Sequence, residues 1–222
     1  MKNSLQFSPY HNYKYLIFTS ILISAGIMFT VTISAARIII VRANITTIAA
    51  DAIVNAANTK LQKGGGIDGA IHAAAGPELQ VYLDEYFPKG CPTGGAVITP
   101  SFMLAPRIQY IIHTPGPKCA KGQKSGEVPE VLQRQLNDCY VHCMDLANQN
   151  YIRTLAFPSI STGIFHYPLK DAAFIAIGAV SGWTQTNPDT VIFVLYDEAT
   201  LRVYQEVLTE LGYHEHEGEW VK

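Results

Sequence analysis

The chain has 222 residues, of which 48% are hydrophobic and 15% are charged, a composition that suits one α/β domain with a sizeable core. Its formal net charge of −2 supplies no basic surface for a phosphate backbone, which argues against a long nucleic acid as a partner. The four cysteines lack C-x-x-C spacing, and a domain of this size needs no disulfides, so we expect reduced thiols and no metal site.

Residues 16–36 form the first notable segment, because they carry no charge. At ~1.5 Å per residue such a helix is long enough to cross a hydrocarbon core of ~30 Å, which predicts a membrane anchor and membrane contact there. Two alternatives stay open: a signal peptide, since Ser34-Ala35-Ala36 resembles a cleavage site, and a translation start further down the chain. Because reduced cysteines suit a reducing compartment, we expect the domain that follows to be cytoplasmic.

The next segments predict an anion site. The apolar run Arg37–Arg42 and the run Ala52–Val54 predict buried strands. Three glycines, Gly64–Gly66, then lead into an Ala-rich helix, Asp68–Ala75, that Gly76 ends. A strand, a glycine loop and a helix N-terminus in this order present backbone N–H groups to an anion, for which we expect a phosphate.

Three other interpretations of this loop compete with a phosphate site. The glycines of residues 64–69 satisfy G-x-G-x-x-G, but that dinucleotide motif follows its strand directly, and here residues 58–63 intervene. A Walker A loop requires Lys-Ser or Lys-Thr after the glycines, which this chain lacks. A glycine turn with only a structural role is the third interpretation, and the polar group formed by Asn55, Asn58 and Asp68 argues against it.

Strands and helices alternate through the rest of the chain, which predicts a sheet with helices on both faces. The expected helices are Pro77–Phe87, Glu127–Asn150, one opened by Pro168, and Glu198–Leu211; the expected strands are Gly95–Pro100, Gln109–Thr114, Thr154–Ile160 and Thr190–Tyr196. Residues 161–165 are a second candidate phosphate loop, and both loops can flank one crevice because ligands lie beyond the carboxyl ends of parallel strands. The His- and Glu-rich residues 213–222 are expected at the surface.

Several motifs resemble those of the macrodomain family of ADP-ribose-binding proteins. In the family's order they are IVNAAN (53–58), GGGIDGAIH (64–72), CPTG (91–94), IHTPGP (112–117), FPSISTG (157–163) and YDE (196–198). The resemblance covers about residues 37–212 and is closest to bacterial O-acetyl-ADP-ribose deacetylases and MacroD-type mono-ADP-ribosylhydrolases, which carry the pair Asn58 and Asp68. It implies a three-layer α/β/α fold with a mixed central sheet, preceded by the extension 1–36 and followed by the tail 213–222.

The resemblance also implies where ADP-ribose binds: the adenine after the first strand, the diphosphate between the two loops, and the distal ribose next to Asn58, Asp68 and Phe165. The implied binding residues are Asn44, Ile45, Asn58, Gly65, Gly66, Ile67, Asp68, Ser161, Thr162, Gly163, Ile164 and Phe165. Two of them depart from the family pattern. Asn44 replaces an Asp that accepts a hydrogen bond from adenine, and Phe165 replaces a common Tyr.

The implied activity is hydrolysis of the ester in O-acetyl-ADP-ribose, extending to ADP-ribose on acidic protein side chains. Asn58 would position a ribose hydroxyl or a water, and Asp68 would orient or deprotonate the water. No cofactor or metal is needed. The implied partners are ADP-ribose, its esters and mono-ADP-ribosylated proteins. A module that binds ADP-ribose without turnover is the main alternative, and a nicotinamide dehydrogenase using the glycine loop is a weaker one.

Overall fold

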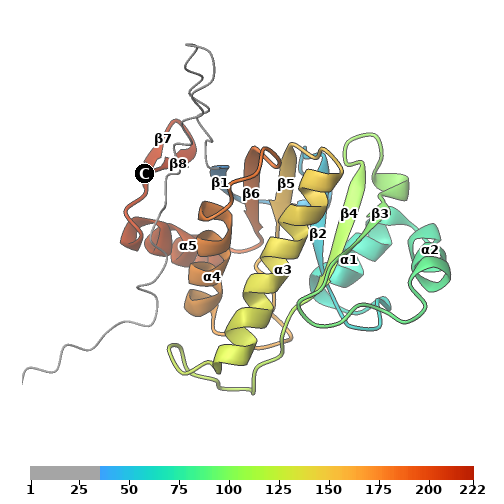
Figure 1. The fold of residues 1–222 in the computed structure, drawn as a ribbon, viewed down its shortest axis with the longest axis horizontal. Coiled ribbons are helices and arrows are strands. Elements are labelled where there is room, and N and C mark those ends of the chain that lie inside the picture. The colour runs from blue at the N-terminus through green and yellow to red at the C-terminus, as the bar shows by residue number, and fades with distance from the viewer. Residues whose placement is uncertain (1–35) are drawn as a thin grey trace, which may run out of the picture. The chain divides into compact units, whose positions relative to one another are not determined.

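A mixed eight-stranded sheet organises the computed structural model, which describes residues 36–222 (Figure 1). The strand order is β3-β4-β2-β5-β6-β1-β8-β7. The strands are β1 (Arg37–Arg42), β2 (Ala52–Ala57), β3 (Val97–Pro100), β4 (Tyr110–Pro115), β5 (Thr154–Phe157), β6 (Thr190–Leu195), β7 (His214–His216) and β8 (Glu219–Val221).

The five strands β4, β2, β5, β6 and β1 are mutually parallel, while β3 and β8 pair antiparallel to the two outer members of this set. The parallel strands read as nearly continuous apolar runs, and all six residues of β6 are buried, because helices cover both faces. The carboxyl ends of the five parallel strands therefore meet at one edge of the sheet, where ligand sites form in this class of fold.

Helices pack on both faces of the sheet and enclose two separate cores (Figure 1). The larger core lies under α3 (Glu130–Gln149), α4 (Leu169–Ser181) and α5 (Glu198–Glu210). The smaller core lies under α1 (Gly66–Ala75) and α2 (Glu78–Tyr86), with the short 3₁₀ helices η1 (Ile45–Thr47) and η2 (Phe102–Leu104) beside them. The expected three-layer α/β/α architecture is confirmed, and each strand and helix predicted after residue 36 is present with bounds within three residues of the expectation.

The C-terminal tail forms a structure that was not predicted. Strands β7 and β8 make an antiparallel hairpin, and β8 extends the sheet by pairing with β1 through Ile38 and Trp220. Trp220 packs its half-buried ring against the larger core, and Glu219 forms an ion pair of 2.8 Å with Arg37. The tail is polar at β7 and nevertheless closes the edge of β1, which would otherwise expose unpaired backbone groups.

The predicted membrane segment falls almost wholly on residues 1–35, outside the part of the chain that the structure describes. Within residues 36–222 no helix has both the length and the apolar character required to cross a membrane. The same residues contain no cluster of three or more His, Cys, Asp or Glu side chains suited to hold a metal ion.

Replacing Trp220 tests the role of the hairpin. Trp220→Ala should lower the free energy of unfolding by about 1–2 kcal/mol, because it removes a half-buried aromatic ring from the edge of the larger core. Urea unfolding followed by circular dichroism measures the change. Val221→Ala, at an exposed neighbouring residue of the same strand, should change it by less than ~0.5 kcal/mol. Equal stability of the Trp220→Ala variant and the unmodified chain would show that the hairpin does not stabilise the sheet.

Candidate functional site

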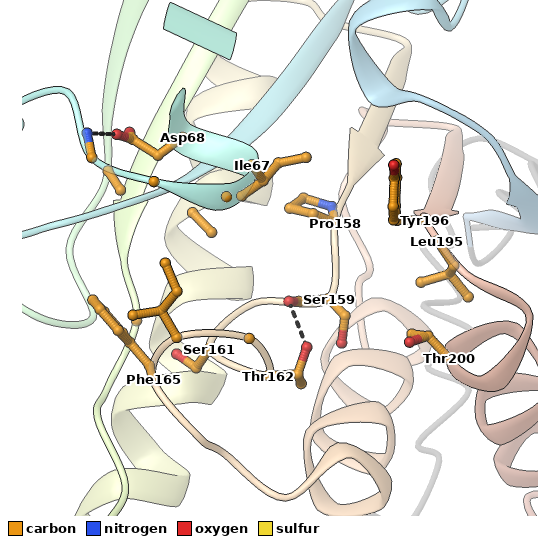
Figure 2. A pocket seen from close by; sticks show the side chains of 18 of the residues that line it. Ile67, Asp68, Pro158, Ser159, Ser161, Thr162, Phe165, Leu195, Tyr196 and Thr200 are labelled. Atoms are coloured by element: carbon orange, nitrogen blue, oxygen red, sulfur yellow. Dashed lines mark hydrogen bonds between the residues drawn. The ribbon is translucent and has the colours of Figure 1, made fainter. Parts of the chain in front are cut away.

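A cavity of about 400 Å³ opens at the carboxyl edge of the parallel strands. It is lined by the ends of β2, β5 and β6, by the glycine loop with the start of α1, and by the loop between β5 and α4. In Figure 2, Asp68 and Phe165 lie at one end of the cavity, and Leu195, Tyr196 and Thr200 lie at the other. The residues that line it include Asn58, Gly64, Gly65, Gly66, Ile67, Asp68, Gly116, Pro158, Ser159, Ser161, Thr162, Gly163, Ile164, Phe165, Leu195, Tyr196, Asp197 and Thr200.

The glycine loop presents the N-terminus of α1 to this cavity. Gly65 is the cap residue of the helix and offers no side-chain hydrogen bond to the first turn. The N–H groups of the first turn lack intrahelical acceptors, so they remain available to a ligand. None of the residues that the structure places around the cavity is Lys, Arg or His, and its charged side chains are Asp68 and Asp197. An anion bound here would therefore be held by backbone N–H groups and by the helix dipole.

The loop of residues 161–165 forms the facing wall. Ser161 has a φ of 67°, a left-handed conformation that is uncommon for a non-glycine residue, and it turns the chain sharply after β5. Gly116, which follows β4, allows this turn: a Cβ atom at Gly116 would lie 2.1 Å from Ser161 Oγ. The same loop reaches across the cavity, since Ile164 Cδ1 lies 3.4 Å from the position that a Cβ would take at Gly65. The two predicted phosphate loops are thus brought together.

Asp68 is buried, with 4% of its surface exposed, and both of its carboxylate oxygens accept hydrogen bonds. Asn55 Nδ2 donates to Oδ1 at 2.7 Å, and the backbone N–H of Gly64 donates to Oδ2 (Figure 2 shows the second bond). Nε2 of His72 lies 3.6 Å from Oδ1. The carboxylate therefore ties the glycine loop to α1 and to β2 while it faces the cavity.

Hydrogen bonds connect Asp68, through Asn55 on β2, to polar side chains on β4 and β3. Asn55 Nδ2 lies 3.1 Å from Nδ1 of His113 on β4, and His113 Nε2 lies 3.0 Å from Thr99 Oγ1 on β3. Thr99 uses its hydroxyl proton to bond the carbonyl of Pro100, so we assign the proton of His113 to Nε2, which leaves Nδ1 to accept from Asn55. Every side chain in this chain of contacts is buried. It fixes the orientation of the Asn55 amide and, through it, that of Asp68.

Both histidines near the carboxylate favour the neutral form. Burial, together with a smaller effect of neighbouring His72, lowers the pKa of His113 to about 3. Burial also lowers the pKa of His72, against the opposing effect of Asp68, with a smaller lowering from Lys63. A neutral His113 is the form that the hydrogen bonds require, because only a neutral ring can accept from Asn55.

Asn58 lies at the same end of the cavity, and its amide is held by its own loop. The side-chain Nδ2 donates to the carbonyl of Gln62, and Oδ1 accepts from the backbone N–H groups of Lys60, at 3.1 Å, and Gln62, at 3.3 Å. The side chain is half-buried. Asn58, Asp68 and Phe165 are therefore brought together around one end of the cavity.

The structure places Asn44 and Ile45 outside the group of residues that line the cavity. Asn44 caps η1, where its Oδ1 accepts from the backbone N–H of Thr46 at 3.0 Å and from the Thr46 hydroxyl at 2.9 Å. Ile45 is 1% exposed and belongs to the smaller core. Both residues follow β1, whose last residue pairs with Leu195, so they lie next to the Tyr196 end of the cavity without lining it.

Sequence reasoning did not assign several lining residues to the site. Tyr196, which is 84% exposed, lies beside Leu195, and Pro158 and Ser159 follow β5 on the same side. The YDE motif (196–198) indicated that the residues after β6 matter, but nothing in the sequence showed that β6 lies between β5 and β1. That adjacency is a property of the sheet topology.

Buried neutral His113 predicts a pH dependence of stability. The unfolded side chain titrates near ~6.5, so between about pH 6.5 and 3 the unfolded state binds the additional proton. The free energy of unfolding should therefore fall as the pH decreases through this range, by up to ~1.4 kcal/mol per pH unit for one proton. Urea unfolding at pH 7 and pH 5 measures the loss, which should be smaller in His113→Gln. Equal losses in the two proteins would contradict this assignment.

Comparison with known proteins agrees with this geometry. Residues 54–176 match the family model described as Macro domain. A Citrobacter rodentium protein named O-acetyl-ADP-ribose deacetylase is 44% identical over 180 residues, which cover 79% of this chain and 97% of the relative. An Oceanobacillus iheyensis macrodomain with ADP has a TM-score of 0.71 at 38% identity, and the alignment covers 81% of this chain and 93% of that one. A Trypanosoma brucei macrodomain in complex with ADP-ribose has a TM-score of 0.67 at 33% identity, over 76% of this chain and 68% of that one. The chain belongs to the macrodomain family.

Proposed function

We propose that this macrodomain binds ADP-ribose and hydrolyses its acyl esters, O-acetyl-ADP-ribose among them. The observation that carries the proposal is the position of Asp68 and Asn58 at the end of a cavity whose anion-binding groups are the N–H groups of a helix N-terminus. The deacetylase name of the Citrobacter rodentium relative and the ADP-ribose bound to the Trypanosoma brucei macrodomain support it.

The ligand would lie along the cavity. Its diphosphate would occupy the space between the glycine loop and residues 161–165, where Gly65 and Ile164 face each other. The adenine would lie at the end formed by Leu195 and Tyr196, and the exposed Tyr196 ring offers an apolar face for stacking. The distal ribose would then lie beside Asp68 and Phe165.

The chemistry at the distal ribose needs a water that attacks the ester carbonyl, with the ribose oxygen leaving as a hydroxyl. We assign Asp68 to orient this water or to take its proton, and Asn58 to position it or a ribose hydroxyl. Orientation is the larger part of this role, because both carboxylate oxygens already accept hydrogen bonds from the protein. The contacts from Asn55 and Gly64 hold the carboxylate in place before substrate binds.

The same attack would release ADP-ribose from acidic protein side chains, because that linkage is also an ester of the distal ribose. We extend the proposal to such mono-ADP-ribosylated proteins. The distal-ribose end of the cavity reaches the glycine loop, where Gly64, Gly65 and Gly66 are exposed, so a protein substrate could approach from this side.

Asp68→Ala tests the catalytic assignment. Turnover of O-acetyl-ADP-ribose should fall by about 10²–10⁴-fold, because the group that orients water is lost. Affinity for ADP-ribose, measured by calorimetry, should fall much less, since backbone N–H groups bind the diphosphate. Asp197→Asn is the matched control: it removes the other carboxylate of the cavity, keeps the cap of α5, and should leave turnover at saturating ester nearly unchanged.

Undiminished hydrolysis by Asp68→Ala would contradict the mechanism. Absence of turnover in the unmodified protein, together with intact ADP-ribose binding, would favour the non-catalytic binding module. Thermal unfolding of each variant should accompany the assays, because Asp68→Ala leaves the amide of Asn55 and the N–H of Gly64 without their acceptor.

Asn44→Asp tests the adenine end. The carboxylate keeps an oxygen to cap η1 and adds a charged acceptor beside Leu195, so ADP-ribose should bind about 1 kcal/mol more tightly. Calorimetry with ADP-ribose measures the gain. Asn44→Ala should show no gain and should lose ~0.5–2 kcal/mol of stability with the cap. Unchanged affinity in Asn44→Asp would show that residue 44 does not face adenine.

A further inference from the structure

A second cavity, of about 320 Å³, adjoins the distal-ribose end of the first. The two cavities share Asn58, Gly116 and Phe165, so they meet where the proposed function places the scissile ester. The residues that line the second cavity are Asn58, Thr59, Thr93, Gly116, Pro117, Lys118, Gln135 and Phe165.

The walls of the second cavity are held by backbone contacts. The carbonyl of Thr59 accepts from the N–H of Cys91 at 2.9 Å, and this approach requires glycine at residue 90, where a Cβ would lie 2.0 Å from the same carbonyl oxygen. Gly94, next to Thr93, donates its N–H to the carbonyl of Pro115 at 2.9 Å. The cavity is therefore formed before any ligand binds, as small-molecule sites usually are.

Lys118 supplies the only charge among the residues that the structure places around this cavity. Its ammonium lies 4.6 Å from the centroid of the Phe165 ring, a cation–π distance. The next residue, Cys119, donates its backbone N–H to the carbonyl of Phe165 at 2.9 Å, which holds this part of the loop beside the ring.

The ammonium of Lys118 lies in a different cavity from the one in which the diphosphate would bind. Lys118 lines the second cavity and not the first, where the diphosphate is assigned to backbone N–H groups. The other polar side chains of the second cavity are the Thr59 and Thr93 hydroxyls and the amides of Asn58 and Gln135, and no carboxylate among the lining residues neutralises the ammonium. The cavity thus offers a positive charge and hydrogen-bond donors to whatever group extends beyond the distal ribose.

The second cavity has a much larger volume than an acetyl group. With three heavy atoms, an acetyl group takes roughly the space of two waters, about 60 Å³ at ~30 Å³ per water. Most of a cavity of about 320 Å³ would stay filled with water behind an acetyl ester. A longer acyl chain would fill more of it and would reach toward the ammonium.

We propose that the second cavity is an acyl subsite in which Lys118 selects esters of ADP-ribose whose acyl chain is longer than acetyl and ends in a carboxylate. This inference rests on the proposed function, and it names half-esters of dicarboxylic acids as the favoured substrate class. In the reaction, water adds to the ester carbonyl, the bond between that carbon and the ribose oxygen breaks, and the ribose oxygen takes one proton of the water. The dicarboxylic acid leaves as its dianion, with the second proton passing to solvent.

Three esters of ADP-ribose test the subsite: the acetyl ester, the neutral four-carbon butyryl ester and the four-carbon succinyl half-ester. The last two match in chain length and differ in the terminal carboxylate, so the ratio of their kcat/KM values isolates the charge. In the unmodified full-length protein we expect the kcat/KM of the half-ester to exceed that of the butyryl ester by up to about fivefold, because Lys118 is exposed and an exposed ion pair contributes at most ~1 kcal/mol. The excess should shrink as salt is added.

Lys118→Met keeps an unbranched side chain over Phe165 and removes the charge, so the ratio should fall to near one. Lys118→Glu should reverse it in favour of the butyryl ester. Lys121→Met is the matched control, because Lys121 lies on the same loop, is exposed and lines neither cavity; it should keep the ratio of the unmodified protein.

The outcomes separate this proposal from the proposed function. A ratio at or below one in the unmodified protein, or one that Lys118→Met leaves unchanged, would overturn the acyl subsite even if the acetyl ester is hydrolysed well. If none of the three esters is hydrolysed, the proposed function fails, and calorimetry then decides the subsite. In that case the half-ester must bind more tightly than the butyryl ester by a margin that Lys118→Met abolishes, and equal affinities overturn it.

Discussion

The burial of one carboxylate, that of Asp68, is the constraint on which the site depends. A carboxylate with 4% exposure needs hydrogen bonds to offset its desolvation, and Asn55 and the Gly64 N–H provide them. These bonds join β2, the glycine loop and the first turn of α1 into one unit. The loop that presents N–H groups to an anion is therefore held by the same side chain that faces the proposed distal ribose.

The support for Asp68 extends across three strands. Asn55 on β2 can donate to Asp68 and to His113 at once because an amide carries two N–H bonds, and His113 on β4 can accept only while it is neutral. Its burial at the centre of the sheet keeps it neutral, and the Thr99 hydroxyl oxygen on β3 accepts a hydrogen bond from its Nε2–H. A substitution at any of these buried groups would leave a partner unpaired in an apolar environment, which is costly.

The two cavities differ in the groups that would bind an anion: backbone N–H groups in the first and a lysine side chain in the second. None of the described residues that line the first cavity has a basic side chain. An anion there would be bound by the N–H groups and dipole of α1 and by the loop after β5. In the second, Lys118 places one ammonium beside Phe165. The net charge of −2 is compatible with this division, because neither arrangement needs a basic surface.

Local sequence patterns determined most of the fold and the contiguous motifs of the candidate site. Apolar runs predicted β1 to β6, helical spacing of apolar residues predicted α3, and glycine and proline at helix ends helped to predict α1 and α4, because these signals depend on neighbours along the chain. The glycine loop, Asp68 and residues 161–165 were found for the same reason, since each is a contiguous motif after a strand.

The tertiary structure alone decided what depends on contacts between distant segments: the β7–β8 hairpin that closes the β1 edge, the placement of Tyr196 beside the two loops, the contact of Asn55 with His113, and the contact of Lys118 with Phe165. The hydrogen bonds of Asn44 are an example, because the resemblance suggested an acceptor for adenine at this residue, and only the structure shows that the side-chain Oδ1 caps η1. A short polar side chain bonds whichever donor the folded backbone brings nearest, and that donor is set by three-dimensional packing.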